Sequence, residues 1–302
     1  MNYFIKVYGW HVTDMDYNMD YEDFYLLDCP AILYERLNIR VIKKGWKNIV
    51  EFTREMLNLN YYVYLILDTA KLTVHTGDFF HDIMVYGYDD ENEAFYAADC
   101  FKNGKYSFEK ISYYDFSQSF AYEQSDFENI FEFHDDIILI RENPDFNPDF
   151  HPSRVKESIE NYLNAVPEKY TYSRLKLEYP EEYKQYFFGK EHYKILYKHV
   201  EYGINHGGVL PHHRQVFHLM YEMKNVMCER IKFMRETEHL HNGEQYLDKY
   251  IMLRDLALSC QNLILKYQIS NDTNILYNVA EKVSNIEKIE LQTMRKMLDD
   301  IV

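Results

Sequence analysis

The chain has 302 residues, of which 47% are hydrophobic, and this composition predicts one large or two modest folded domains rather than a disordered chain. A formal net charge of −16 argues against nucleic acid and anionic membrane surfaces as partners, because nothing overall attracts phosphate groups. We find no apolar run long enough to span a membrane and no secretion signal near residue 1, so we expect a cytoplasmic protein.

The cysteine spacing excludes two kinds of site. The four cysteines lie far apart and form no C-x-x-C pair: Cys29, Cys100, Cys228 and Cys260. A disulfide framework or a thiolate zinc site is therefore not expected, and we expect reduced thiols and no cofactor.

The first 145 residues alternate between strand-like and helix-like patterns. Asp28 is a suitable N-cap and Pro30 suits a first helical turn, which indicates a helix start around Cys29. In chain order we expect a loop over 15–23, a helix from 28 to about 37, a strand over 38–42, a helix over 47–57, strands over 61–67, 81–87, 95–98 and 105–112, a helix over 113–130 and a strand over 136–141.

Three prolines within residues 142–153 indicate a linker, and the chain beyond them has helical periodicity. The expected helices cover 155–163, 180–202, 212–238, 245–266 and 273–301. We therefore predict an α+β fold with an N-terminal domain (residues 1–145) built on an antiparallel sheet and an all-helical C-terminal domain (residues 146–302). The apolar stripe of the last helix favours core packing, with a dimer seam as the alternative.

A histidine and an aspartate occupy corresponding positions in the expected hairpin of residues 81–101. Alternation places His81 on one sheet face with Ile83 and Val85, and pairing residues whose numbers sum to 182 sets Asp99 opposite Ile83. His81 then lies on the diagonal of that pair, about 7 Å away on the same face. A carboxylate that holds an imidazole in one tautomer is the orienting half of a nucleophilic triad. The alternative is a histidine that merely caps a sheet edge, with an aspartate in the next turn.

The same region resembles a known family. The residues that carry the resemblance are Asp68, His81, Gly87-Tyr88-Asp89, Asp99, Gly104-Lys105-Tyr106 and Ile111-Ser112. They are similar to the domain of the butirosin-biosynthesis acyltransferase H-like family, which has a papain-like, C39-type cysteine-peptidase fold and belongs to natural-product pathways. The resemblance implies that residues 1–145 form a papain-like domain, that His81 is the general base or thiolate partner, and that Asp99 is its orienting carboxylate.

The function that this resemblance implies is acyl or aminoacyl transfer from a carrier-protein thioester to an amine. The expected partners are then an acyl or peptidyl carrier protein and a small-molecule amine acceptor. One alternative is a catalytically silent binding or scaffold protein that keeps the cysteine-peptidase-like frame without its nucleophile. A third reading is peptide hydrolysis, which the missing secretion signal disfavours.

The nucleophile has two readings. Cys29 precedes Pro30 at the expected helix start, where a helix N-terminus lowers the pKa of a thiol. Alternatively, the cysteine-bearing segment is absent, through truncation, a misassigned start or degeneration. Cys100 follows Asp99 and points to the opposite face of the strand, so we reject it as the nucleophile. Cys228 and Cys260 lie within expected helices and are expected to be small buried core residues.

For most other polar residues a structural role is preferred over a functional one. A metal site built from His75, Asp78, His81 and Asp82 matches no closed zinc pattern, so no metal is expected. Asp68 either positions substrate, as the resemblance implies, or terminates a strand in a turn. Two pairs are expected to be solvated helix-end residues: His212 with His213, and His239 with His241.

The expected helix over 212–235 is rich in cations for so acidic a chain. It carries Arg214, Lys224, Arg230, Lys232 and Arg235. An acidic carrier domain would dock there by charge complementarity. The alternative is a solvated face whose cations pair with acidic neighbours within the chain.

Overall fold

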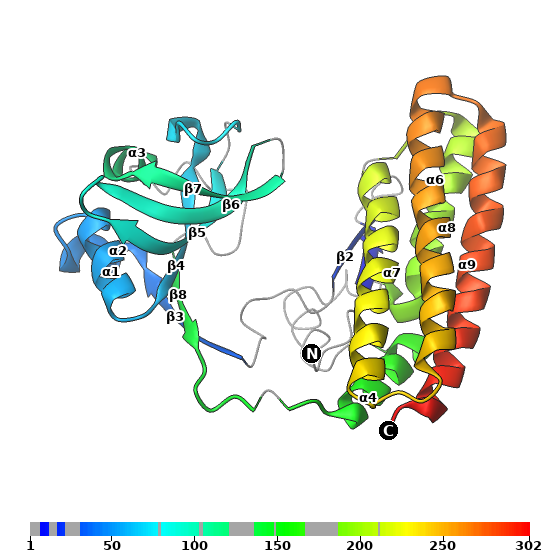
Figure 1. Ribbon diagram of the computed structural model, residues 1–302. Helices are drawn as coiled ribbons and strands as arrows, with labels where there is room; N and C mark the ends of the chain where they lie inside the picture. The colour runs from blue at the N-terminus through cyan, green and yellow to red at the C-terminus, as the bar shows by residue number, and fades with distance from the viewer. Residues whose placement is uncertain are drawn as a thin grey trace. The chain divides into compact units, whose positions relative to one another are not determined.

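The computed structural model describes residues 7–11, 17–21, 31–77, 80–102, 105–120, 136–147, 149–166, 187–210 and 212–302. Contacts divide the chain into two compact units (Figure 1). The sheet unit is Tyr25–Asn147, and the helical unit combines Met1–Phe24 with Pro148–Val302. This division differs from the expected domains 1–145 and 146–302 at the N-terminus, where the first strands group with the helical unit.

The sheet unit is built on a six-stranded antiparallel sheet, which agrees with the α+β class expected from the sequence. The strand order is β3-β8-β4-β5-β6-β7. The strands are β3 (Ile32–Asn38), β4 (Tyr62–Asp68), β5 (Phe80–Asp89), β6 (Ala94–Lys102), β7 (Lys105–Ser112) and β8 (Asp136–Glu142). The helices are α1 (Ile39–Gly45), α2 (Ile49–Asn58) and α3 (Tyr113–Ser119), and a 3-10 helix spans Thr69–Lys71.

One face of this sheet forms the core of the unit. Alternate residues of β4 and β5, among them Leu65, Ile83 and Val85, are almost fully buried. Helices α2 and α3 contact the sheet and add Phe52 and Phe116 to the same core. Each such side chain stabilises the fold by about 1.5–3 kcal/mol through burial. His81 lies two residues before Ile83 in β5, so strand alternation places it on the face that carries this apolar layer.

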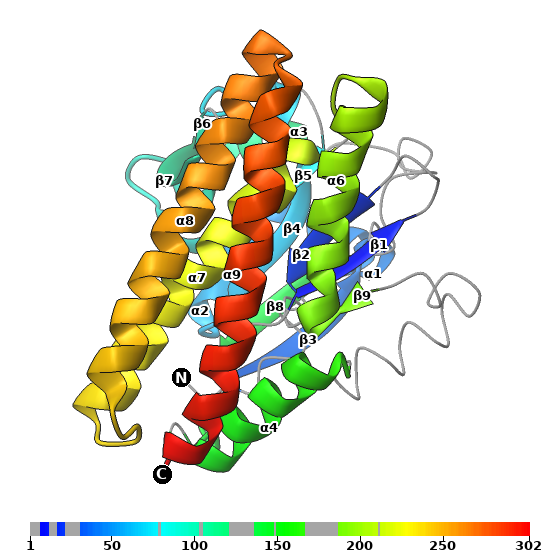
Figure 2. The same ribbon diagram turned by 90° about the vertical axis from the view of Figure 1, so that its right-hand side faces the viewer.

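In the part of the helical unit that the structure describes, the long helices run side by side in both views (Figures 1 and 2). Its elements are α4 (Pro152–Asn164), α6 (His192–His206), α7 (His213–Glu236), α8 (Gly243–Ser270), α9 (Thr273–Asp300), a 3-10 helix over Gly189–Glu191, and a small antiparallel sheet of β2 (Tyr17–Tyr21), β1 (Val7–His11) and β9 (Phe187–Phe188). The last helix is packed into the core through Val283, Ile286 and Met297, as the preferred reading of its stripe predicts.

Three sequence predictions near the N-terminus are wrong. The segment predicted to be helical up to residue 37 contains β3, the predicted strand over 38–42 is the start of α1, and the predicted loop over 15–23 contains β2. Pairing with other strands decides the first and third cases: β3 pairs with β8, and β2 pairs with β1. Asn38 is the N-cap of α1: its side chain accepts a hydrogen bond from the Arg40 N–H, and the helix begins at Ile39.

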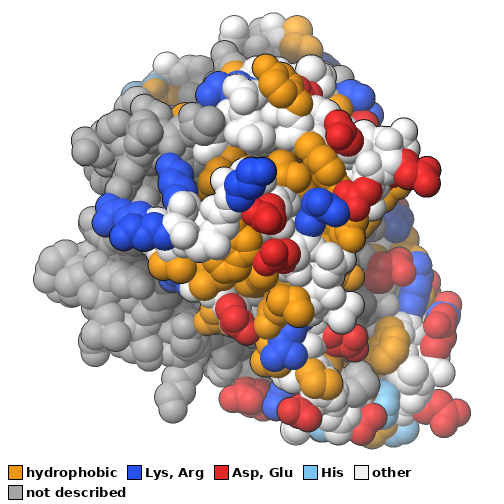
Figure 3. All heavy atoms as spheres, turned by 90° about the vertical axis from the view of Figure 1, so that its left-hand side faces the viewer, with side chains coloured by type: hydrophobic (Ala, Val, Ile, Leu, Met, Phe, Trp, Pro, Cys, Tyr) orange, Lys and Arg blue, Asp and Glu red, His pale blue; other side chains and the backbone are white. Residues whose placement is uncertain are grey.

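The described surface carries scattered apolar side chains. Tyr106, Phe108 and Tyr114 of the sheet unit are exposed. On the face drawn in Figure 3, apolar patches are separated by acidic and basic side chains of both signs. Among the described helices, none combines the length and the apolar character that crossing a membrane requires.

Gly189 provides a test of packing in the helical unit. Its φ is +49°, and a Cβ there would overlap the backbone of Tyr162. We expect Gly189→Ala to lower the free energy of unfolding by about 2–4 kcal/mol, because left-handed strain and a backbone clash add. Gly208→Ala is the control: its φ is +76° but its Cβ would meet nothing, so a loss of about 1 kcal/mol is expected. Urea unfolding followed by circular dichroism measures both, and equal losses would contradict the packing.

Candidate functional site

The β5–β6 hairpin has the register that the sequence predicts, but it reaches this register by a different route. Met84 pairs with Ala98, a pair whose numbers sum to 182. The turn, however, is closed by Asp89 and Ala94, and a bulge between Val85 and Gly87 shifts the pairing by one residue. The turn between Asp89 and Ala94 is one residue shorter than a turn flanked by Tyr88 and Ala94, and the extra residue of the bulge compensates, so His81 and Asp99 stay on one face.

The structure brings the two predicted site residues into contact. The Nδ1 atom of His81 lies 3.1 Å from Oδ1 of Asp99 and 3.2 Å from Oδ2. The Asp99 side chain is buried, at 5% exposure, whereas His81 retains 33%. The hydrogen bond to Asp99 raises the pKa of His81 above its usual value, although burial of the ring opposes the rise. The arrangement is an accessible imidazole held through one nitrogen by a buried carboxylate.

His75 is a second imidazole beside the same carboxylate. Its Nε2 atom lies 3.5 Å from Oδ2 of Asp99, and the His75 side chain is only 3% exposed. The sequence pattern suggested His75 only as a metal ligand and did not indicate this contact. Its position depends on the loop of residues 72–77 folding back onto β6, which no local pattern indicates.

Nothing in the described part of the chain supports the metal reading. No group of three histidine, cysteine or carboxylate side chains within the described ranges has a geometry that could hold a metal ion. Asp82 accepts a hydrogen bond from the Tyr64 hydroxyl. Asp82 and Asp99 are therefore engaged separately, and Asp78 lies outside the described residues.

Several residues of the family-like motif have local structural roles. Asp89 accepts hydrogen bonds from the backbone and side chain of Asn92 and from Lys110, and these contacts lower the pKa of Asp89 to about 2. Asp68 caps the 3-10 helix by accepting from the Ala70 N–H and forms an ion pair with Lys71 at 3.0 Å. The turn-forming reading of Asp68 thus has direct support, and its role toward substrate stays a prediction.

None of the three described cysteines has the properties of an activated thiol. Cys100 follows Asp99 in β6 and faces the other way, and its pKa is raised by burial and by the nearby Asp99 carboxylate. Cys228 and Cys260 are buried in the helical unit, as predicted, and burial raises the pKa of Cys260 to about 12. Cys29 lies outside the described residues, so its reading as the nucleophile stays a prediction.

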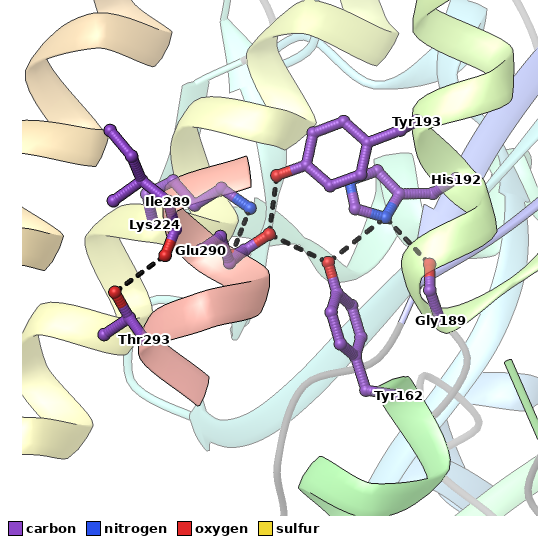
Figure 4. Close-up of polar contacts among 8 residues, drawn as sticks. All are labelled: Tyr162, Gly189, His192, Tyr193, Lys224, Ile289, Glu290 and Thr293. Atoms are coloured by element: carbon purple, nitrogen blue, oxygen red, sulfur yellow. Dashed lines mark hydrogen bonds and ion pairs between the residues drawn. The ribbon is translucent and has the colours of Figure 1, made fainter. Parts of the chain in front are cut away.

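A second polar cluster lies inside the helical unit (Figure 4). Lys224 donates to Glu290 Oε1 at 2.5 Å, while the hydroxyls of Tyr193 and Tyr162 donate to Oε2 at 2.5 and 3.0 Å. His192 Nδ1 lies 2.8 Å from the Gly189 carbonyl oxygen and 3.4 Å from the Tyr162 hydroxyl. Lys224 and Glu290 are 0% and 1% exposed, so this ion pair is sealed from water.

The charges in this cluster are set by burial and by mutual attraction. Burial alone would raise the pKa of Glu290, but Lys224 and the hydrogen bonds bring it below its ordinary value. Burial, assisted by Lys224, lowers the pKa of His192 to about 4, so that ring is neutral at physiological pH. The network joins α4, α6, α7 and α9 and has no exposed member, which indicates a structural role.

The cationic helix is largely engaged within its own unit. Lys224 is buried, which corrects its reading as a surface cation. Lys232 forms an ion pair with Glu229 at 2.7 Å, and Arg235 pairs with Glu244 and Glu236. These contacts favour the internally paired alternative over carrier docking at α7. His213 is 2% exposed rather than solvated, because it packs against Phe217 and His199 at the start of α7.

The fold and the pair at the hairpin define the class that the structure supports: an α+β chain with a six-stranded antiparallel sheet, a helical unit and a buried carboxylate on an accessible imidazole. Comparison of the chain with protein-family models and with curated proteins finds no match. The geometry of this site and the motif residues are therefore the basis of the proposed function.

Removing the Asp99 charge tests the His81 contact. We expect Asp99→Asn to lower the pKa of His81, because burial of the ring then acts without its largest opposing interaction. A pH titration of the histidine ring protons by NMR measures the shift. Asp82→Asn is the matched control, since Asp82 contributes less than Asp99 to the pKa of His81. Equal shifts in the two variants would contradict the contact.

The same pair predicts a pH dependence of stability with a definite sign. Because the pKa of His81 is raised in the folded state, its contribution is complete below the unfolded value of about 6.5 and is lost as pH rises through the folded value. The stability difference between the wild type and Asp99→Asn is therefore expected to be larger at about pH 5.5 than at about pH 9. Urea unfolding at the two pH values checks this, and the opposite trend would refute it.

Truncating one half of the sealed ion pair tests the helical cluster. We expect Lys224→Met to destabilise the unit by about 3–5 kcal/mol, because Glu290 stays buried without its cation. Lys232→Met, on the same helix but in an exposed pair, is expected to cost less than about 1 kcal/mol. Hydrogen exchange of the α9 amides reports on the unit directly. Similar protection in both variants would show that Lys224 does not stabilise this core.

Proposed function

We propose that the sheet unit is a papain-like domain that transfers an acyl or aminoacyl group from a carrier-protein thioester to an amine. The observation that carries the proposal is the contact between the accessible His81 imidazole and the buried Asp99 carboxylate, 3.1 Å apart. It accords with the resemblance of this hairpin to the butirosin-biosynthesis acyltransferase H-like family. His81 is the proposed general base and Asp99 its orienting group.

The geometry supports different proposed tasks for the two ring nitrogens of His81. Contact with the Asp99 carboxylate favours a proton on Nδ1, so Nε2 is the proposed basic nitrogen of neutral His81. Asp99 also stabilises the imidazolium that forms when Nε2 accepts a proton, which is the physical meaning of the raised pKa of His81. This is the division of roles that an acyl-transfer base requires.

The reaction proceeds in two balanced steps. His81 takes the thiol proton of the nucleophile, the thiolate attacks the thioester carbonyl of the donor, and the carrier thiol leaves with a proton from the imidazolium. The amine then attacks the enzyme-bound thioester while His81 accepts the amine proton, and the enzyme thiol is released as the amide forms. Cys29 is the proposed nucleophile.

The alternative is a silent binding or scaffold protein that keeps the same frame. One observation favours it: the three described cysteines are buried or face away from Asp99, and the pKa of each is raised. The enzymatic proposal therefore depends entirely on Cys29. If that thiol is not activated, the imidazole–carboxylate pair has no nucleophile within this chain to serve.

Thiol reactivity distinguishes the two functions. At about pH 6 an ordinary thiol, with a pKa near 8.5, is almost fully protonated and reacts slowly with iodoacetamide. We expect Cys29 to be alkylated at least about tenfold faster than the other three cysteines, and His81→Gln to abolish this advantage because the imidazolium no longer stabilises the thiolate. Peptide mapping by mass spectrometry measures each rate. Cys100→Ser is the control and leaves the Cys29 rate unchanged.

The alkylation rates distinguish the acyltransferase from the silent binding protein. Uniformly slow alkylation of all four thiols favours the silent binding protein. Fast alkylation that survives His81→Gln excludes His81 as the thiolate partner. For a reactive Cys29, incubation with an acyl thioester of N-acetylcysteamine tests the transfer itself: the expected product is a mass increase on Cys29 equal to the acyl group, lost on adding an amine.

A further inference from the structure

We infer that His75 is a positioning residue, whose ring N–H holds the Asp99 carboxylate in the orientation that contacts His81. The catalytic meaning of this inference rests on the proposed function, but its structural content does not. The carboxylate lies between two imidazoles: His81 approaches both oxygens, and His75 approaches Oδ2. The pair of residues foreseen from sequence is thus a set of three.

A backbone hydrogen bond fixes which nitrogen of His75 carries the proton. The Gly77 N–H donates to Nδ1 of His75 at 2.8 Å, so Nδ1 is an acceptor and carries no proton. The neutral ring must then carry its proton on Nε2, the atom that faces Asp99. At 3.5 Å this contact is longer than an ordinary N–H···O hydrogen bond, so the Nε2–H acts on the carboxylate as a nearby oriented dipole. Both side chains are at least nine-tenths buried, so water screens the interaction little.

The loop that carries His75 is attached to the strand that carries Asp99. The Thr76 N–H donates to the Phe101 carbonyl oxygen at 3.1 Å, and the His75 ring packs edge-on against the Phe101 ring. The His75 N–H also closes a turn onto the Leu72 carbonyl oxygen. Because Phe101 is two residues beyond Asp99 in β6, the loop and the carboxylate share one rigid support.

A second N–H near the Asp99 carboxylate restricts the orientation of that group. One imidazole that contacts both carboxylate oxygens leaves the carboxylate free to tilt about its own axis, whereas an N–H from another direction restricts that motion. In metal sites, residues that orient a ligand from behind change affinity or activity by about 10- to 100-fold when they are lost, and we expect an effect of that order here. His75 has the burial and the defined tautomer that such a role requires.

The test compares two substitutions at position 75. His75→Leu fills the space but offers no N–H, whereas His75→Gln keeps an N–H donor. The readout is the ¹⁵N spectrum of the His81 ring above its pKa, which reports the fraction of neutral His81 protonated on Nδ1. We expect this fraction to be high in the wild type and in His75→Gln, and to fall clearly in His75→Leu. An unchanged fraction in His75→Leu overturns the inference.

Two further measurements keep the inference independent of folding and of catalysis. In the wild type, the ¹⁵N shifts of His75 itself must show the Nε2–H tautomer, and an Nδ1–H tautomer overturns the inference without any variant. If Cys29 reacts, His75→Leu is expected to slow its alkylation by about tenfold, with rescue by His75→Gln. A tautomer effect with an inert Cys29 supports the positioning role while refuting the proposed acyl transfer.

Discussion

The contact between His81 and Asp99 depends on the register of one hairpin. The side chains belong to residues 18 positions apart, and a one-residue slip of β6 against β5 would turn Asp99 to the opposite sheet face. The register is held from both sides: the apolar residues Ile83 and Val85 must face the core, and the Asp89 turn with its Asn92 and Lys110 contacts closes the other end. Core packing and turn chemistry together place one imidazole beside one carboxylate.

Sequence periodicity was sufficient to locate the strands and helices whose conformation is decided by which of their residues are buried. Strands β4, β5, β7 and β8 and helices α2, α7, α8 and α9 lie close to their predicted positions, because their apolar residues repeat with the period of the element. Prediction failed for β3, which is an edge strand with four exposed residues in its middle. Its conformation comes from pairing with β8 and from the Arg36–Asp136 ion pair, 100 residues apart in the chain. No local window contains that information.

The candidate site divides in the same way. His81 and Asp99 could be paired from alternation and summed register, and the pairing holds because the one-residue bulge of the hairpin offsets its one-residue shorter turn. His75 could not, since its contact depends on an irregular loop that is attached to β6 through Thr76. The sealed cluster of the helical unit did leave a signal that was overlooked. Lys224 lies four residues after Met220, and Glu290 four after Ile286, so each charge occupies a core position of its helix.

The two polar clusters show why one is a candidate for chemistry and the other is not. In the helical unit, Lys224 and Glu290 are both sealed, and the Tyr162 and Tyr193 hydroxyls complete the coordination of the carboxylate. Proton transfer to that site would strand a buried charge. At the hairpin, burial is unequal: Asp99 and His75 are shielded, whereas a third of His81 meets solvent. His81 can therefore gain a proton while its ring stays in contact with water, and the buried Asp99 carboxylate stabilises the charge that results. This difference in burial between Asp99 and His81 is the physical basis of the proposed function.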